Sequence, residues 1–265
     1  MTALDALFEK LWGDYAAMNT QAEVIHRALE ARGEKIVNDH IAFRTFQTPL
    51  IGIDAIAAPF VKHGYRPAED YTFEEKKLAA RYYTPPDPLL PKVFISALKT
   101  HEFSEELQSV IRDLLAQVKS PSGEDFLISG TPWKKISWAQ YQGLLRESEY
   151  AAWMAAFGFR VNHFTVFYNE LKTFADFREL NTFIKGLGFA LNQAGGEVKG
   201  SPSVYLEQSS TLAHPVEVEF ADRREVIPAC YYEFARRYPM PDGKLFQGFI
   251  PDSANRIFES THFRK

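Results

Sequence analysis

Two histidines and an arginine lie in stretches of the sequence that look alike and read as strands. NDHIAFRTF carries His40 and Arg44, and VNHFTVFYN carries His163. Alternate side chains of a strand share a face, so His40, Ala42 and Arg44 lie together, and the small alanine leaves room in front of the other two. Imidazoles are common metal ligands, and a guanidinium binds a carboxylate through two parallel hydrogen bonds. These residues therefore predict the wall of a binding pocket.

Further similarity indicates that one structural unit is used twice. Each strand is followed by a helix that ends in glycine and an aromatic residue, VKHGYRP and KGLGFAL, and then by a proline-led strand, PKVFISAL and PVEVEFAD. A divergent duplication places the two first strands side by side about a pseudo-two-fold axis, which brings His40 and His163 together. The fold is predicted to be α+β, with two βαβββ modules forming a half-open barrel and additional helices packed outside.

The second proline-led strand carries carboxylates that the first one lacks. Glu217 and Glu219 share one face of PVEVEFAD, whereas PKVFISAL has Val93 and Ile95 at the matching places. Two histidines and one carboxylate leave positions open on Fe(II) for a bidentate substrate and O₂, and zinc or manganese accepts the same ligand types. Paired glutamates on a strand are also common on solvent-exposed faces, and Arg44 could equally be a salt-bridge partner near a helix.

Helical periodicity surrounds the two modules. We expect helices in the first 35 residues, an amphipathic helix from Leu107 to Val118, and one helix over 137–157. After the second module we expect one short helix, CYYEFARRY, and otherwise loop. The predicted organisation is a single domain over 1–265, divided into a helical N-terminus (1–35), module 1 (36–100), a helical insertion (101–157), module 2 (158–225) and a C-terminal segment (226–265).

The composition is that of an ordinary globular protein, with 46% apolar and 24% charged residues and a net charge of −4. This balance favours neither nucleic acid nor an anionic membrane as a partner. The single cysteine, Cys230, excludes an internal disulfide and suits a reducing compartment. The start lacks the apolar stretch of a signal peptide, and no apolar run is long enough to span a bilayer. A cytoplasmic protein is expected, and its oligomeric state is left open.

The motifs together resemble one known family. NDHIAFRTF, VNHFTVFYN, PVEVEF followed by IPACYYEFARRYP, and GFIPDSANRIFEST are similar to the short members of the 2-oxoadipate dioxygenase/decarboxylase family, in the vicinal-oxygen-chelate superfamily. The resemblance covers the chain from about Val37 to its C-terminus. It implies a non-haem Fe(II) oxidoreductase that converts 2-oxoadipate and O₂ into 2-hydroxyglutarate and CO₂ in lysine degradation. Zinc, nickel or manganese can substitute for iron at such ligands.

The resemblance also implies roles for single residues. His40 and His163 match the metal histidines, with His40 also beside the substrate, and Glu217 matches the glutamate ligand, with Glu219 as the second choice. Arg44 matches the arginine that binds the substrate. Two alternatives stay open: a metal-dependent isomerase or lyase of the same fold without O₂ chemistry, and a non-catalytic metabolite-binding module.

Overall fold

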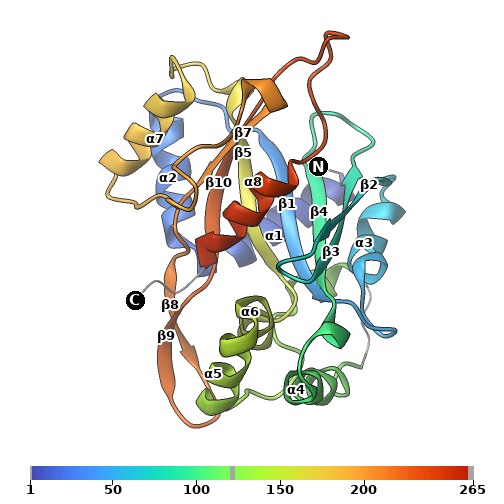
Figure 1. Cartoon of the computed structure of the whole chain (residues 1–265). Helices are drawn as coiled ribbons and strands as arrows, with labels where there is room; N and C mark the ends of the chain where they lie inside the picture. The colour runs from blue at the N-terminus through green and yellow to red at the C-terminus, as the bar shows by residue number, and fades with distance from the viewer. Residues whose placement is uncertain (1, 120–122, 262–265) are drawn as a thin grey trace.

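The computed structural model describes residues 2–119 and 123–261 and shows a curled eight-stranded sheet with helices on both faces (Figure 1). The sheet has the order β2-β3-β4-β1-β5-β10-β7-β6, and β8 and β9 form a separate two-stranded ribbon. The strands are β1 (Asn38–Phe46), β2 (Arg66–Phe73), β3 (Leu78–Thr84), β4 (Lys92–Leu98), β5 (Val161–Phe167), β6 (Lys199–Ser201), β7 (Leu206–Ser210), β8 (Pro215–Glu219), β9 (Arg224–Pro228) and β10 (Tyr231–Arg237). The α-helices are α1 (Ala3–Met18), α2 (Thr20–Ala31), α3 (Ile53–Lys62), α4 (Glu105–Leu115), α5 (Trp138–Glu147), α6 (Glu149–Phe157), α7 (Phe177–Gly186) and α8 (Pro251–Phe258). Across the described ranges, none of these helices is both long and apolar enough to cross a membrane.

The sheet consists of two similar halves. The first half runs β1-α3-β2-β3-β4, and the second runs β5-α7-β6-β7-β10. In each half the first and last strands pair in parallel, and β1 pairs with β5 antiparallel at the centre of the sheet. The predicted α+β fold of two βαβββ modules is confirmed, and the two first strands are neighbours as a duplication requires.

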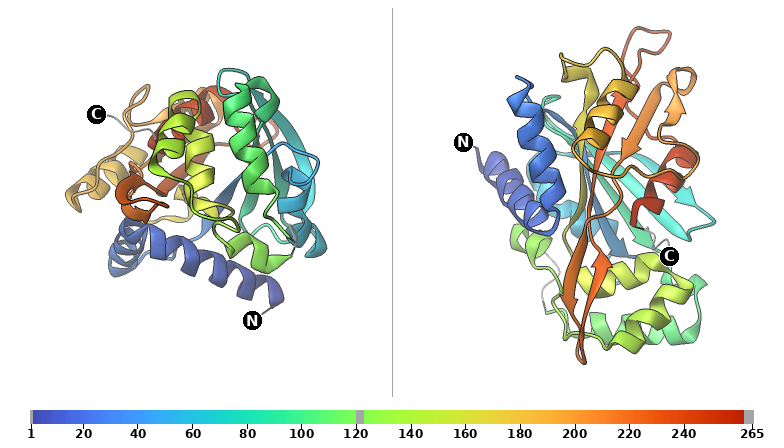
Figure 2. Two further views of the ribbon diagram at one scale, coloured as in Figure 1. Left: turned by 90° about the horizontal axis from the view of Figure 1, so that it is seen from below. Right: turned by 90° about the vertical axis from the view of Figure 1, so that its left-hand side faces the viewer.

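The concave face of the sheet is covered by the C-terminal helix. Helix α8 contacts both β2 and β6, which are the two edges of the sheet, so the sheet curls far enough to form a half-open barrel around one side of this helix. Helices α1 and α2 lie against the opposite, convex face (Figure 2). There Trp12 packs edge-on against Phe164 at 5.0 Å between ring centroids. Because both faces are covered, the central strands are buried along almost their whole length.

The helix expected over 137–157 is in fact two helices. Ser148 has an extended backbone that ends α5, and its hydroxyl accepts a hydrogen bond from the Ala151 amide at 3.1 Å, which caps α6. The break places Tyr150 in the first turn of α6. Its hydroxyl accepts a hydrogen bond from Thr45 on β1 and donates one to the Ser96 carbonyl on β4, so the inserted helices are fixed to module 1.

The C-terminal part of the chain differs most from the sequence prediction. The segment expected to be a helix, CYYEFARRY, contains β10, which closes module 2, so this module extends to Arg237 rather than ending at 225. Bulky Tyr232 and Phe234 alternate with Glu233 between the two faces, which suits a strand. The stretch expected to close the module, PVEVEFAD, instead contributes β8 to the inserted ribbon. The tail expected to be loop contains α8, which begins at Pro251 as its first helical residue.

Candidate metal centre

The two predicted histidines meet at the centre of the concave face. His40 lies on β1 and His163 on β5, with their ring centroids 5.6 Å apart and their planes at 86°. Both side chains are buried. The pairing of β1 with β5 sets this approach, since His40 is directly opposite Thr165 and His163 directly opposite Ala42.

A β-bulge precedes each histidine. The ladder between β1 and β5 skips Asp39 on one strand and Asn162 on the other. A bulge re-aims the side chain of the extra residue, and here Asp39 Oδ1 lies 2.8 Å from His40 Nδ1 and Asn162 Oδ1 lies 3.0 Å from His163 Nδ1. Both oxygens accept, so Nδ1 carries the proton in each ring and Nε2 is the unprotonated nitrogen, the form that a metal ion requires. On His40 this nitrogen lies 3.1 Å from the Thr165 hydroxyl, which donates to it in the absence of a metal ion.

Glu233 is the third member of this group. It lies on β10, beside β5, and its Oε2 is 3.2 Å from His163 Nε2 while its Oε1 is 3.7 Å from His40 Nε2. One ligand atom from each of the three buried residues lies within 4.8 Å of the others. Ligand atoms about 2.1 Å from one ion and at right angles to each other lie about 3.0 Å apart, so the spacing suits a shared metal ion.

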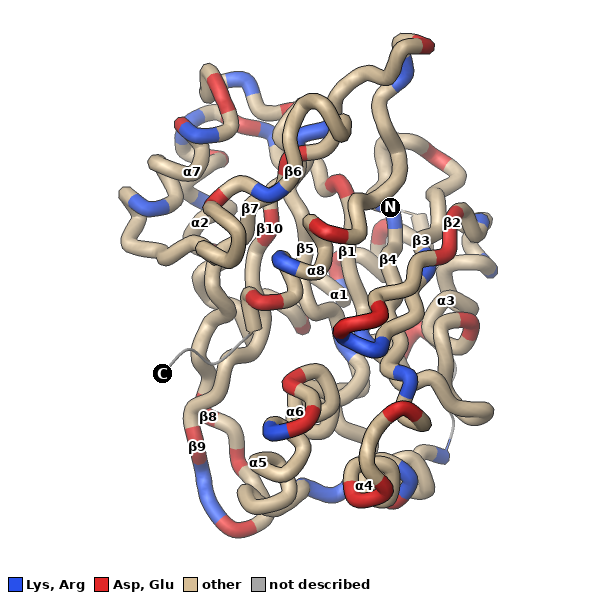
Figure 3. Tube along the Cα trace, in the orientation of Figure 1, with Lys and Arg blue, Asp and Glu red and all other residues tan. Residues whose placement is uncertain are grey.

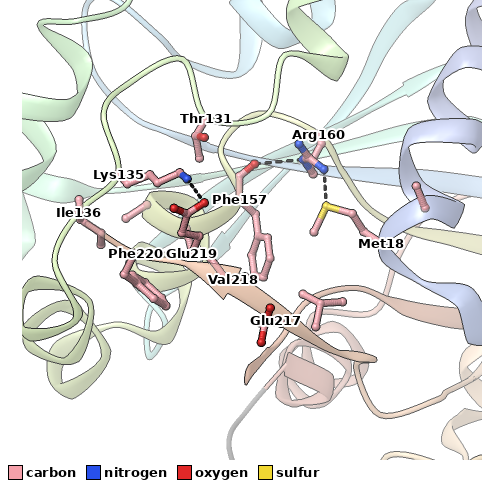
Figure 4. A pocket seen from close by; sticks show the side chains of 14 residues that line it. Met18, Thr131, Lys135, Ile136, Phe157, Arg160, Glu217, Val218, Glu219 and Phe220 are labelled. Atoms are coloured by element: carbon pink, nitrogen blue, oxygen red, sulfur yellow. Dashed lines mark hydrogen bonds and ion pairs between the residues drawn. The ribbon is translucent and has the colours of Figure 1, made fainter. Parts of the chain in front are cut away.

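The prediction that Glu217, or else Glu219, completes this group is wrong. Both residues lie on β8 of the separate ribbon, with side chains 59% and 57% exposed. Glu217 pairs with Arg224 at 3.2 Å and Glu219 with Lys135 at 2.5 Å, and Figure 4 shows Glu219 directed at that lysine. Both acidic and basic residues lie along this ribbon (Figure 3), as on a solvated surface. The two glutamates line another cavity, of about 400 Å³, whose lining includes neither histidine.

The repeat itself contained the signal that identifies Glu233. In the parallel pair β1–β4, His40 is aligned with Lys92, and Phe94 follows two residues later. In the parallel pair β5–β10, His163 is aligned with Tyr231, and Glu233 follows two residues later. An alignment of PKVFISAL with CYYEFARR, rather than with PVEVEFAD, would have pointed to this residue. The inserted ribbon hides the correspondence, because it places another strand at the expected distance along the chain.

The charge state of the group suits a cation. Burial raises the pKa of Glu233 to about 8, although a hydrogen bond from Gln208 opposes this, and burial lowers the pKa of both His40 and His163. Within the described ranges, Glu233 Oε2, Gln208 Oε1 and the Tyr231 hydroxyl are buried without a hydrogen-bond partner. Buried polar atoms are normally satisfied. A metal ion held by two neutral imidazoles and a carboxylate would satisfy the glutamate oxygen and compensate its charge.

The cavity in front of this group is small and covered by apolar residues of the C-terminal segment. It has a volume of about 20 Å³, and Phe249, Ile257 and Phe258 form part of its lining. The ring of Phe249 stands edge-on to His40 at 4.9 Å between centroids. This space accommodates an ion or a water molecule, so a larger ligand requires the covering residues to move.

Arg44 lies on β1 beyond Ala42 and is only 2% exposed. Its Nη2 donates to Thr261 Oγ1 at 2.9 Å, and its Nη1 is 3.6 Å from Glu149 Oε1. In the part of the chain that the structure describes, Arg44 Nε and Nη1 make no hydrogen bond. The arginine lines a neighbouring cavity of about 340 Å³, and Phe258 lines both this cavity and the one at the histidines. Arg44 thus lines a pocket that adjoins the one at the histidines, and the side chain of Phe258 lies at the boundary between the two.

The chain matches a known family over most of its length. A family model described as 2-oxoadipate dioxygenase/decarboxylase matches residues 6–127 and 125–246. A protein from Arabidopsis thaliana named 2-oxoadipate dioxygenase/decarboxylase, chloroplastic, is 34% identical over 271 residues, which covers 91% of this chain and 72% of the relative.

Solved structures agree with this match. The hydroxyglutarate synthase of Oryza sativa, crystallised in complex with 2-oxoadipate, has a TM-score of 0.90 and 34% identity, with 97% of this chain and 91% of the other covered. A protein from Shewanella frigidimarina described as a hydrolase has a TM-score of 0.90 and 49% identity, with 95% and 99% covered. A protein from Ralstonia eutropha assigned to the glyoxalase superfamily is similar in fold alone, with a TM-score of 0.75 and 23% identity over 92% and 84% of the two chains.

Proposed function

Since the chain belongs to the 2-oxoadipate dioxygenase/decarboxylase family, we propose that it is an Fe(II)-dependent enzyme that oxidatively decarboxylates a 2-oxo dicarboxylic acid. The favoured substrate is 2-oxoadipate, which with O₂ gives 2-hydroxyglutarate and CO₂. The observation that carries the proposal is the buried convergence of His40, His163 and Glu233. The assignment to lysine degradation stays a prediction, as does the cytoplasmic location, since the Arabidopsis relative is named chloroplastic.

The three residues form the ligand set that is typical of non-haem iron oxygenases and leaves coordination positions open. When bound, Fe(II) would supply redox and Lewis-acid chemistry for a 2-oxo acid. His40 and His163 present Nε2 to the ion because their Nδ1 atoms are engaged by Asp39 and Asn162. Glu233 supplies the single negative charge, and Gln208 Nε2 donates a hydrogen bond of 2.7 Å to its Oε1.

Arg44 is proposed to bind the carboxylate of the substrate that is remote from the metal. A buried carboxylate without a partner is costly, and a guanidinium offers two parallel donors with fixed geometry. Arg44 Nε and Nη1 are buried donors without hydrogen bonds in the described ranges, so each side of the guanidinium has one donor available for a ligand, beside the Nη2 that donates to Thr261. The apolar cover made by Phe249 and Phe258 would exclude water from the bound substrate.

Oxygen consumption tests this proposal directly. Metal-free protein is loaded with Fe(II) without air and mixed with 2-oxoadipate in oxygenated buffer, and O₂ uptake, CO₂ and 2-hydroxyglutarate are measured. We expect the three quantities in equal amounts, and Glu233→Gln should abolish turnover while Glu217→Gln retains it. Turnover of a 2-oxo acid without O₂ uptake would instead indicate a Lewis-acid isomerase or lyase, and no turnover of any 2-oxo dicarboxylate would indicate a binding module.

A further inference from the structure

The two histidines occupy equivalent positions in the two modules but have chemically different partners. Each partner is the residue before the histidine, and each is placed by the same kind of bulge. For His40 the partner is the carboxylate of Asp39, whereas for His163 it is the neutral amide of Asn162. Hydrogen bonds to an ionised acceptor are roughly twice as strong as neutral ones. The two histidines, equivalent by duplication, therefore make Nδ1 hydrogen bonds of unequal strength.

Asp39 is in turn held by a buried arginine. Arg237 on β10 donates Nε to Asp39 Oδ2 at 2.6 Å and Nη2 to Asp39 Oδ1 at 2.8 Å, a two-point pairing. Arg237 is 1% exposed and Asp39 is 5% exposed. Both donors of this pairing belong to a charged guanidinium, so its geometry favours the ionised form of the carboxylate.

The same arginine also fixes the residues that cover the cavity. Its Nη1 donates to the carbonyl oxygens of Phe246 and Gly248, at 3.0 and 2.8 Å. The next residue is Phe249, whose ring contacts His40 and also lies 5.3 Å from the Arg237 guanidinium. The covering segment 246–249, the arginine, the aspartate and the histidine thus form one continuous set of contacts.

We propose that Asp39 and Arg237 are positioning residues that hold His40 as the more strongly supported metal ligand and tie the covering segment 246–249 to it. The inference rests on the proposed metal site but not on the identity of the substrate. Asp39 orients the imidazole and makes Nε2 a better donor. Arg237 orients Asp39 and, through the two carbonyl oxygens, the segment that carries Phe249.

The first test is metal affinity. Asp39→Asn gives His40 the same partner that His163 already has, so it removes the charge and leaves an acceptor in place. Zn²⁺ affinity, measured by competition with a chromophoric chelator, should fall by about ten- to a hundred-fold, the usual effect of losing such a partner. Glu217→Gln is the matched control, since it removes one negative charge from an exposed position and should leave the affinity unchanged.

The second test reports on the covering segment. Lys244 is exposed in the loop before Phe246, so trypsin cleavage there measures how often this loop opens. Arg237→Lys keeps the positive charge but cannot reach Asp39 and both carbonyl oxygens at once. We expect this variant to be cleaved several-fold faster at this site than the unaltered protein and to bind Zn²⁺ more weakly. A variant that loses affinity but keeps the cleavage rate would overturn the link between the two.

Two further measurements keep the proposal testable if a single variant does not fold. Asp39→Asn leaves Arg237 buried without its counter-ion, and the double variant Asp39→Asn/Arg237→Gln removes both charges. In the unaltered Zn²⁺-loaded protein, the Nδ1 proton of His40 should resonate downfield of that of His163 in an imidazole-selective NMR spectrum. Equal shifts, or a double variant with the original affinity, would refute the proposal. If Glu233→Gln still bound Zn²⁺ as tightly as the unaltered protein, the metal site itself would be wrong instead.

Discussion

Replacing Glu233 with glutamine is expected to abolish metal binding and, at the same time, to stabilise the metal-free protein. Glutamine has the same shape, and its Oε1 can still accept the hydrogen bond that Gln208 donates to Glu233 Oε1 at 2.7 Å. Its NH₂ group would replace Oε2, which lies 3.2 Å from His163 Nε2, and could donate to that nitrogen. The substitution thus removes a buried charge without leaving a cavity or a new unsatisfied atom.

The size of the effect follows from the pKa of Glu233. Burial raises it from its ordinary value of 4.5 to about 8 in the folded, metal-free protein. Below pH 4.5 both the folded and the unfolded chain hold the proton, so the full stability is present. Between pH 4.5 and 8 only the folded chain keeps it, and stability falls as pH rises. At about 1.4 kcal/mol per pKa unit, the free energy of unfolding falls by about 3 kcal/mol at pH 7 and about 5 kcal/mol above pH 8.

Urea denaturation of metal-free protein at several pH values measures this effect. The free energy of unfolding of Glu233→Gln should exceed that of the unaltered protein by less than about 1 kcal/mol at pH 5 and by several kcal/mol at pH 8. Glu217→Gln, at an exposed position, should match the unaltered protein throughout and still bind metal. If the difference in unfolding free energy between Glu233→Gln and the unaltered protein did not grow with pH, Glu233 would not be a buried carboxylate whose ionisation destabilises the metal-free fold.

Arg44→Lys should leave Zn²⁺ affinity unchanged and lower kcat/KM for 2-oxoadipate by about ten- to a hundred-fold, because it keeps the charge but loses the two-point geometry. If Zn²⁺ affinity fell as much as kcat/KM, Arg44 would have a structural role instead. Burial raises the pKa of Glu34, but hydrogen bonds from Thr173 and Lys172 outweigh this and leave it lowered. Glu34→Gln should therefore cost about 1–2 kcal/mol at pH 7 in urea denaturation, with the deficit shrinking as pH falls below about 4.5. Burial raises the pKa of Cys230 to about 12, so iodoacetamide at pH 8 should label it only after unfolding, as mass spectrometry can show.

The two histidines could be predicted because local pattern and repetition agree at these positions. Period-two alternation identifies β1 and β5, and two equivalent histidines in a duplicated unit must approach the symmetry axis. The carboxylate was harder to place by the same means, because its counterpart in module 1 is the apolar Phe94 and an insertion separates β7 from β10. The partners Asp39 and Asn162 are also hidden in the sequence. In a regular strand they would point away from the histidines, and only the bulges turn them back.

The loss of symmetry between the modules explains why such a site can react. Phe94 and Glu233 occupy equivalent positions in the two modules. Phe94 lies two residues after Lys92, which is aligned with His40, and Glu233 lies two residues after Tyr231, which is aligned with His163. A glutamate in place of Phe94 would give the ion four protein ligands, as in closed structural sites. With phenylalanine there, one module supplies a histidine and a carboxylate and the other supplies a histidine and an apolar wall. Phe94 lines the cavity together with His40, His163 and Glu233, so the side of this group that a symmetric carboxylate would fill is an apolar wall instead.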